Sequence, residues 1–189
     1  MKVLGIVGSP REGGNTEHLV RECLKTISAG GIEVEIVTLH DREIGPCNAC
    51  GICGEIKNEC AIDDDFAGIY EKVREADGLV VGSPVYFGSA TSQLMALLQR
   101  LGYVVRCGDD ILTRKVGAPI VVARRAGQNF TLAEINYFFF IMGMIVPGSI
   151  YWNIAFGRDK GEAMKDTEGL ETITKLGENF AWLLGKIHG

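Results

Sequence analysis

The sequence predicts an α/β fold in which a parallel sheet of five strands lies between two layers of helices. Short runs of apolar and β-branched residues alternate with longer segments of helical periodicity, the order typical of a parallel sheet covered on both faces. The first run, residues 2–7, is apolar almost throughout, as expected for a strand buried on both faces. The chain has 189 residues, 47% of them hydrophobic, so we expect one domain with its own core.

The elements of the first part of the chain follow from local patterns. Residues 16–28 place apolar side chains on one helical stripe, and the Gly30-Gly31 pair ends that helix. Residues 33–39 alternate apolar and polar side chains, which predicts a second strand near an edge of the sheet. Residues 40–65 show neither period and hold most of the cysteines, so we expect them to form a cysteine-rich insertion in the domain.

The later elements are assigned in the same way, helices by their apolar stripes and strands by short apolar runs. In chain order they are a helix at 65–76, strand 78–82, helix 91–101, strand 116–123, helix 132–142, strand 144–151 and a terminal helix at 167–188. Residues 135–157 carry no charge and are long enough to span a membrane. Asn136, Asn153 and the Pro147-Gly148-Ser149 break instead favour a buried helix followed by a strand.

Charge and cysteine content narrow the function classes. The 19 basic and 24 acidic residues give a net charge of −5, and there is no run of Lys or Arg, so nucleic acid is not the expected partner. The apolar run that follows Met1-Lys2 is too short for a secretory signal, which predicts a cytoplasmic protein. In a reducing compartment, clustered cysteines point to metal or redox chemistry rather than disulfides.

The loop between the first strand and the first helix has the residue types that bind a phosphate. Ser9 and Thr16 supply hydroxyls, and Arg11 adds a positive charge. The glycines Gly13-Gly14 leave backbone N–H groups available for a ligand at the start of a helix. No Lys-Ser/Thr pair follows Gly13, so this is not a P-loop, and the glycines are too few for a dinucleotide fingerprint. A glycine-rich turn that ends in a Thr cap is the alternative.

Two further loops are expected at the same edge of the sheet, because ligands of such folds bind beyond the carboxyl ends of the strands. Residues 82–91 are uncharged and include the aromatic pair Tyr86-Phe87, which suits a flat ring with polar edges, although such a pair is more often part of a core. Arg124-Arg125 leave the fourth strand side by side. They are either solvated or offset the negative charge of a ligand.

Together the three loops resemble the FMN site of the flavodoxin-like NAD(P)H-dependent FMN reductases. The matching segments are Ser9-Pro10-Arg11 with Asn15-Thr16, and residues 83–88. The resemblance covers the whole chain in element order and implies a flavodoxin-like α/β/α fold with strand order 2-1-3-4-5. It implies FMN as cofactor, NAD(P)H as a possible reductant, and an FMN site made of Ser9, Arg11, Asn15, Thr16, Pro84, Val85, Tyr86, Phe87, Gly88, Arg124 and Gly127.

Four cysteines are spaced as C-x2-C-x2-C-x6-C, at Cys47, Cys50, Cys53 and Cys60. Zinc sites usually pair two short knuckles a dozen or more residues apart, whereas three cysteines at steps of three wrap an iron–sulfur cluster. The nearby fourth cysteine completes the ligands of a [4Fe–4S] cluster; zinc, and free or redox-regulatory thiols, are the alternatives. Cys23 falls on a buried helix stripe and Cys107 in a loop, so both are expected to be structural.

This motif, placed after the second strand of an FMN-reductase-like chain, resembles the iron–sulfur flavoproteins of methanogens and other anaerobes. The resemblance implies a [4Fe–4S] cluster, FMN as second centre, and a homodimer or homotetramer that brings the cluster of one subunit near the flavin of another. The pairing of centres predicts electron transfer between a one-electron donor such as ferredoxin and a two-electron acceptor. A clusterless NAD(P)H-dependent FMN or quinone reductase and a non-catalytic electron carrier are the alternatives.

No side chain is expected to act as a catalytic acid or base, because the flavin carries the chemistry. His18, His40 and His188 are predicted to be incidental. We expect the flavin and the cysteine segment to lie at the same rim of the sheet. The uncharged surface around Tyr86-Phe87 and Leu94-Met95 is expected to support self-association.

Overall fold

Five parallel strands form one sheet, in the order β2-β1-β3-β4-β5, in the computed structural model, which describes residues 1–189. Each strand pairs in parallel with its neighbours, so the strand order implied by the family resemblance is confirmed. The order reverses direction between β1 and β3, which is where such sheets bind ligands. The strands are β1 (Lys2–Val7), β2 (Glu33–Thr38), β3 (Gly78–Pro84), β4 (Val116–Ala123) and β5 (Ile154–Phe156).

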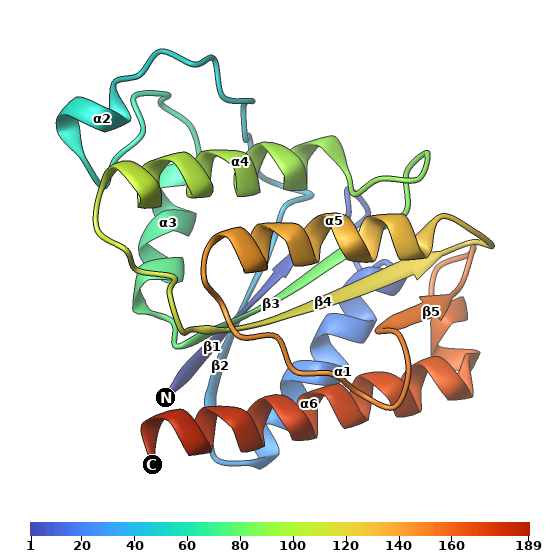
Figure 1. The fold of residues 1–189 in the computed structure, drawn as a ribbon. Helices are drawn as coiled ribbons and strands as arrows, with labels where there is room; N and C mark the ends of the chain where they lie inside the picture. The colour runs from blue at the N-terminus through green and yellow to red at the C-terminus, as the bar shows by residue number, and fades with distance from the viewer.

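Helices cover both faces of this sheet (Figure 1). They are α1 (Asn15–Ala29), the short α2 (Cys53–Ile56), α3 (Phe66–Glu75), α4 (Ser92–Cys107), α5 (Gln128–Ile141), the 3-10 turn η1 (Glu162–Lys165) and α6 (Thr167–His188). Helices α1 and α6 pack on one face, and α3, α4 and α5 pack on the other. The predicted three-layer α/β/α arrangement is therefore confirmed.

The central strands supply side chains to a separate core on each face. In β1, Leu4 and Ile6 join the core under α3, α4 and α5, while Val3 and Val7 join the core under α1 and α6. Side chains alternate across a strand, so burial of both faces requires an unbroken apolar run. All eight residues of β4 are buried in this way.

The fifth strand is not where the sequence predicts it. Residues 144–151 contain only a bridge: the Ile145 N–H donates to Lys115 O, and Ile145 O accepts from Gly117 N–H, both at 2.9 Å. Pro147 follows, and proline has no N–H to continue the ladder, so the chain leaves the sheet. It returns at Asn153, whose carbonyl accepts from Val121 N–H at 3.0 Å, and β5 begins directly afterwards.

Helix α4 is longer than the sequence predicts, ending at Cys107 rather than at residue 101. Gly102 and the two valines after Tyr103 lower helix propensity, but Val104 and Val105 are buried in the core, and tertiary packing outweighs propensity. Helix α5 starts four residues earlier than expected, after Gly127 at a left-handed φ of 88°. None of the helices is both long enough and apolar enough to cross a membrane.

A glycine in β3 allows α1 to approach the sheet at the ligand edge. A Cβ at Gly82 would lie 2.5 Å from Cγ2 of Val20 and 3.0 Å from Cγ2 of Thr16. We expect Gly82→Ala to lower the free energy of unfolding by about 1–3 kcal/mol through overpacking, as measured by urea denaturation. Gly68→Ala is the control, because nothing lies within 4 Å of a Cβ there, and alanine in an exposed helix adds about 0.5–1 kcal/mol. Equal effects in the two variants would contradict the packing argument.

Candidate functional site

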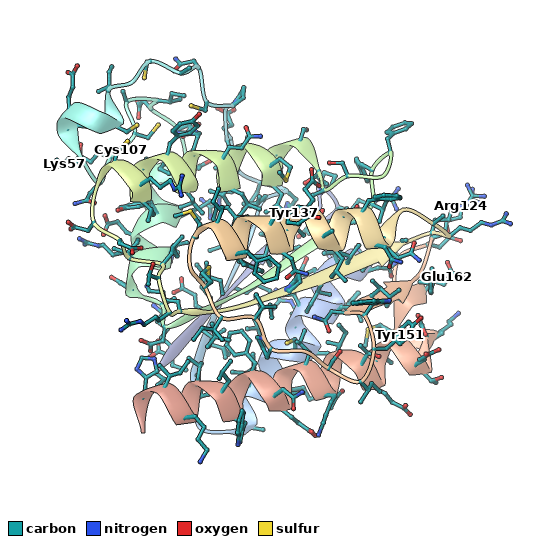
Figure 2. The ribbon with its side chains drawn as sticks, viewed as in Figure 1. Lys57, Cys107, Arg124, Tyr137, Tyr151 and Glu162 are labelled. Atoms are coloured by element: carbon teal, nitrogen blue, oxygen red, sulfur yellow. The ribbon has the colours of Figure 1, made fainter.

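A cavity of about 290 Å³ lies at the carboxyl ends of β1, β3 and β4. Four cations and no carboxylate line it, and one of them, Arg124, extends past the end of β4 (Figure 2). This charge suits an anionic ligand. We call it the cationic cavity; it is lined by Ser9, Arg11, Gly14, Asn15, Thr16, Pro84, Val85, Tyr86, Val122, Arg124, Gly157, Arg158 and Lys160.

The first turn of α1 opens on the cationic cavity. The backbone N–H groups of Asn15, Thr16 and Glu17 have no acceptor within the chain, and the N-cap residue Gly14 offers no side chain to cap them. These are the donors that an α-helix leaves free at its amino end, where the helix dipole is also positive. The geometry therefore favours a bound phosphate group at the start of α1.

The two glycines of the first loop donate their own N–H groups within the loop and its helix. The Gly13 N–H donates to Oε2 of Glu17 at 2.8 Å, and the Gly14 N–H donates to Arg11 O at 3.2 Å. Ser9 Oγ accepts from the Arg11 N–H at 3.2 Å. These bonds use the glycines' own N–H groups to shape the loop, and the free donors are those at the start of α1.

Asn15 links α1 to the loop that follows β5. Its Nδ2 donates to Asp159 O at 2.9 Å, and its Oδ1 accepts from the Ala163 N–H at 3.3 Å. These bonds hold Arg158 and Lys160 beside the cavity, and sequence analysis did not find either residue. Arg158 and Lys160 do follow a strand closely in the sequence, but that strand was predicted at residues 144–151 rather than at β5. The two cations therefore did not stand out as residues at the end of a strand.

The loop after β3 forms a tight turn. Tyr86 and Ser89 exchange both backbone hydrogen bonds, at 2.9 and 3.1 Å, while Phe87 and Gly88 between them take left-handed φ values of 53° and 84°. The carboxylate of Glu134 in α5 accepts from Ser89 Oγ and from the Ala90 N–H, the latter at 2.8 Å. An acidic residue of α5 thus fixes the loop that carries Tyr86.

Eight of the eleven residues predicted to bind FMN line the cationic cavity. Phe87 is fully exposed at the tip of the turn. Gly127 packs against the loop instead, since a Cβ there would lie 2.9 Å from Cγ1 of Val85 and 3.2 Å from Cα of Gly88. The structure therefore places Phe87, Gly88 and Gly127 around the cavity rather than in its lining.

A second cavity, of about 230 Å³, lies between the cysteine segment and the second half of α4. We call it the cysteine cavity, because five of the six cysteines line it: Cys47, Cys50, Cys53, Cys60 and Cys107. The expectation that Cys107 is a structural residue in a loop is wrong, since it ends α4 and faces the other four. Cys23 is the sixth; it is completely buried in the core under α1, where burial raises its pKa to about 12.

The cysteine cavity does not present a ready site for a single ion. No three Cys, His, Asp or Glu side chains converge on one point that could hold a metal, whereas a tetrahedral zinc site needs four ligands about 2.3 Å or less from the ion. The four thiolates of a [4Fe–4S] cluster do not need a common point, because each binds a different iron. The four cysteines of the motif line one largely apolar cavity, and four thiolates are the donor set of such a cluster.

Arg100 ties the cysteine segment to α4. It is 1% exposed, and its guanidinium forms an ion pair with Asp64, with Nη2 2.9 Å from Oδ1. The same group donates to Gly45 O at 3.1 Å and Ile62 O at 3.3 Å, and Nη2 lies 3.3 Å from Sγ of Cys60. One buried cation therefore anchors both ends of the segment that carries the four-cysteine motif.

The two cavities lie at opposite ends of α4, as the positions of Arg124 and Cys107 show in Figure 2. Thr91 caps the start of the helix and donates to Gly8 O at 2.6 Å, next to the cationic cavity. The 16 residues of α4 then span about 24 Å before Cys107. The expectation that both centres share one rim of the sheet is wrong, because the cysteine segment folds back over the far end of this helix.

The fold and the cationic cavity define a flavodoxin-like, flavin-dependent oxidoreductase. The family model for NADPH-dependent FMN reductase matches residues 1–159. An iron–sulfur flavoprotein of Methanocaldococcus jannaschii is 43% identical over 188 residues, which cover 96% of this chain and 96% of that protein. The chain belongs to the NADPH-dependent FMN reductase family and, within it, to the iron–sulfur flavoproteins.

Solved structures show the same fold at low sequence identity. RosB, whose structure contains the bound intermediate 8-demethyl-8-formylriboflavin-5'-phosphate, matches with a TM-score of 0.75 at 22% identity, covering 99% of this chain and 80% of that one. A flavodoxin from the domain Archaea matches with a TM-score of 0.65 at 15% identity, covering 98% and 99%. At these identities the likeness establishes the fold alone, and the flavodoxin-like prediction is confirmed.

We predict that Arg100→Met lowers the free energy of unfolding of the cluster-free chain by about 3–5 kcal/mol, because it leaves the largely buried Asp64 carboxylate without its cation. Urea denaturation measures the change. Arg42→Met is the matched control: Arg42 pairs with Asp65 at 3.5 Å on the surface, and such pairs contribute about 1 kcal/mol or less. A loss at position 100 no larger than at position 42 would refute the anchoring role.

The same pair predicts a pH dependence. Burial alone raises the pKa of Asp64, but the Arg100 guanidinium and the N–H groups of Gly45 and Phe66 outweigh it and hold that pKa below its usual value. The stabilisation is therefore complete above the unfolded-state pKa of about 3.9 and is lost as the pH falls through the lower folded-state pKa. The difference in stability between wild type and Arg100→Met, measured in the same assay, should shrink as the pH falls through that acid range.

Proposed function

We propose that this chain binds FMN in the cationic cavity and a [4Fe–4S] cluster in the cysteine cavity, and that it transfers electrons between a one-electron donor of the ferredoxin type and a two-electron acceptor. The observation that carries the proposal is the gathering of Cys47, Cys50, Cys53 and Cys60 around one largely apolar cavity. The curated relative named an iron–sulfur flavoprotein supports it. When bound, the flavin exchanges one or two electrons and the cluster exchanges one, so the pair can connect the two kinds of carrier.

The residues of the cationic cavity have distinct proposed roles toward FMN. The free N–H groups at the start of α1 hold the phosphate, and Arg11 and Lys160 offset its charge. The loop from Pro84 to Tyr86 offers an apolar surface to the flavin ring, and the turn at Phe87-Gly88 and its contact with Gly127 keep that loop in place. No His, Asp or Glu lines this cavity, so no protein group is assigned as a general acid or base.

The cysteine cavity supplies thiolate ligands in a mostly apolar setting. We assign Cys47, Cys50, Cys53 and Cys60 as ligands, and Arg100 as the residue that orients Cys60 through its contact with Sγ. A group that donates a hydrogen bond to a ligand sulfur fixes the direction of that ligand and tunes its metal centre. Thiolate ligands of iron persist in reducing surroundings, which supports a cytoplasmic location.

The separation of the two cavities supports a homo-oligomer. In one chain the cationic cavity lies near the start of α4 and the cysteine cavity lies against its second half, so we assign to a second subunit the role of bringing a cluster close to a flavin. Of the predicted contact surface, Leu94 is completely buried, whereas Tyr86 and Phe87 are exposed. Three exposed aromatic residues line an uncharged cavity of about 420 Å³ between α5 and the segment before β5: Phe140, Tyr151 and Trp152. We propose this surface for assembly into a homodimer or homotetramer.

The alternative is a clusterless NAD(P)H-dependent FMN or quinone reductase, which the family model favours by its description. Such a protein would show rapid bleaching of its flavin by NADPH after strictly anaerobic purification, with no iron bound. The two functions are therefore separated by counting iron, sulfide and FMN per chain in protein isolated without oxygen.

We predict that Cys50→Ala abolishes the cluster and leaves FMN binding unchanged, because Cys50 lines the cysteine cavity and not the cationic cavity. Iron, sulfide and FMN are counted per chain after anaerobic purification and reconstitution. Cys23→Ala is the control, since Cys23 lies in the core under α1, and it should retain the wild-type iron and sulfide content. Full iron and sulfide in Cys50→Ala would refute the ligand assignment.

We predict that Arg11→Met weakens FMN binding by about tenfold or more, the usual effect of losing a hydrogen bond to a charged group. Fluorescence titration of the FMN-free chain measures the dissociation constant. Riboflavin, which lacks the phosphate, is the matched ligand control, and its affinity should not change. If both ligands lost affinity equally, Arg11 would act on the ring or on the fold rather than on the phosphate.

A further inference from the structure

The cysteine cavity contains one thiol more than a [4Fe–4S] cluster uses. Cys107 is the last residue of α4, and its Sγ lies 3.9 Å from Sγ of Cys53 at the first turn of α2. This is the only contact between two cysteine side chains among the hydrogen bonds of the structure, although Cys47, Cys50 and Cys53 are close in sequence. The nearest partner of Cys53 is therefore 54 residues away along the chain.

Specific contacts hold these two sulfurs together. The Asn58 side chain, two residues beyond the end of α2, accepts from the Asp109 N–H at 2.7 Å and donates to Oδ2 of Asp109 at 3.0 Å. Between Cys107 and Asp109 lies Gly108, where a Cβ would be only 2.0 Å from Oδ1 of Asn58. The end of the cysteine segment is thus fastened to the end of α4 by a contact that requires a glycine.

We propose that Cys53 and Cys107 form a reversible disulfide when the cluster is absent and a small-molecule disulfide such as oxidised glutathione is present. One protein thiolate attacks the oxidant and releases the first small thiol, leaving a mixed disulfide on the protein. The second protein thiol then attacks the cysteine sulfur of this mixed disulfide, forms the Cys53–Cys107 bond and releases the second small thiol. Two protein thiols are oxidised, one small-molecule disulfide is reduced, and the two protons leave on the two released thiols.

Formation of this bond needs little movement. A disulfide requires the sulfurs to approach to about 2 Å, and both side chains already face each other across the cavity at 3.9 Å. The bond would consume one proposed ligand, Cys53, and close the cavity to iron. It would also protect that thiol, since a disulfide is reduced back by thiols whereas sulfinic and sulfonic acids are not.

Disulfide formation itself does not depend on the proposed function, but its consequence, a block on cluster assembly, rests on it. The test uses the full chain, freed of iron by a chelator, incubated with oxidised glutathione, alkylated at its free thiols and digested with trypsin. Cleavage at Arg and Lys places Cys107 in residues 107–114 and Cys53 in residues 43–57. We expect mass spectrometry to find these two peptides joined, with fragment ions that assign the bond to Cys53, and to find them separate after treatment with dithiothreitol.

Two variants make the result specific. Cys47→Ser should retain the linked peptides, because it leaves the 53–107 pair intact, whereas Cys107→Ser should lose them. A bond found mainly among Cys47, Cys50 and Cys53 in the wild type, or an unlinked residue 107–114 peptide after oxidation, would overturn the proposal.

The consequence is tested by reconstitution with ferrous iron and sulfide. Oxidised wild type should take up iron only after dithiothreitol, while Cys107→Ser treated with the same oxidant should take it up directly. Equal uptake by oxidised and reduced wild type would overturn the block on assembly. If reduced wild type itself bound no iron, the cluster assignment would fail while the disulfide, read by mass spectrometry, would still stand.

Discussion

The buried ion pair between Arg100 and Asp64 is the contact on which the cysteine cavity depends. Residues 40–65 contain only one short helix, α2, so neither a ladder of backbone hydrogen bonds nor a broad apolar face fixes their path. Arg100 holds the segment in place instead, because it binds Asp64 and backbone carbonyls near the two ends of the segment. Because two desolvated charges add little net stability, the pair is better understood as fixing where the four thiols lie than as a source of folding energy.

Helix α4 links the two candidate sites while keeping them apart. Its amino end is tied to the first loop by the bond from Thr91 to Gly8 O, and its carboxyl end carries Arg100 and Cys107. This separation of the two cavities along α4 is the reason for proposing that electrons pass between subunits.

Much of the site could be predicted from sequence because the carboxyl ends of parallel strands must meet at one edge. Recognising β1 and β3 was enough to bring Ser9, Arg11 and Tyr86 together. Arg158 and Lys160 were missed because Pro147 ends an apparently continuous strand and moves β5 ten residues along the chain. Cys107 was missed because Gly102 and two valines hide the last turns of α4, whose stability comes from burial against the core.

The sequence alone determined the class of fold and the four-cysteine motif, since both are local: strands and helices show their period within a few residues, and the spacing of the cysteines is fixed by the chain itself. Tertiary structure alone decided which distant residues join each site. Asn15 meets Ala163, Arg100 meets Cys60, and Cys107 meets Cys53 across 40 to 148 residues of chain. Such contacts follow from how whole elements pack, and no local period or spacing encodes them.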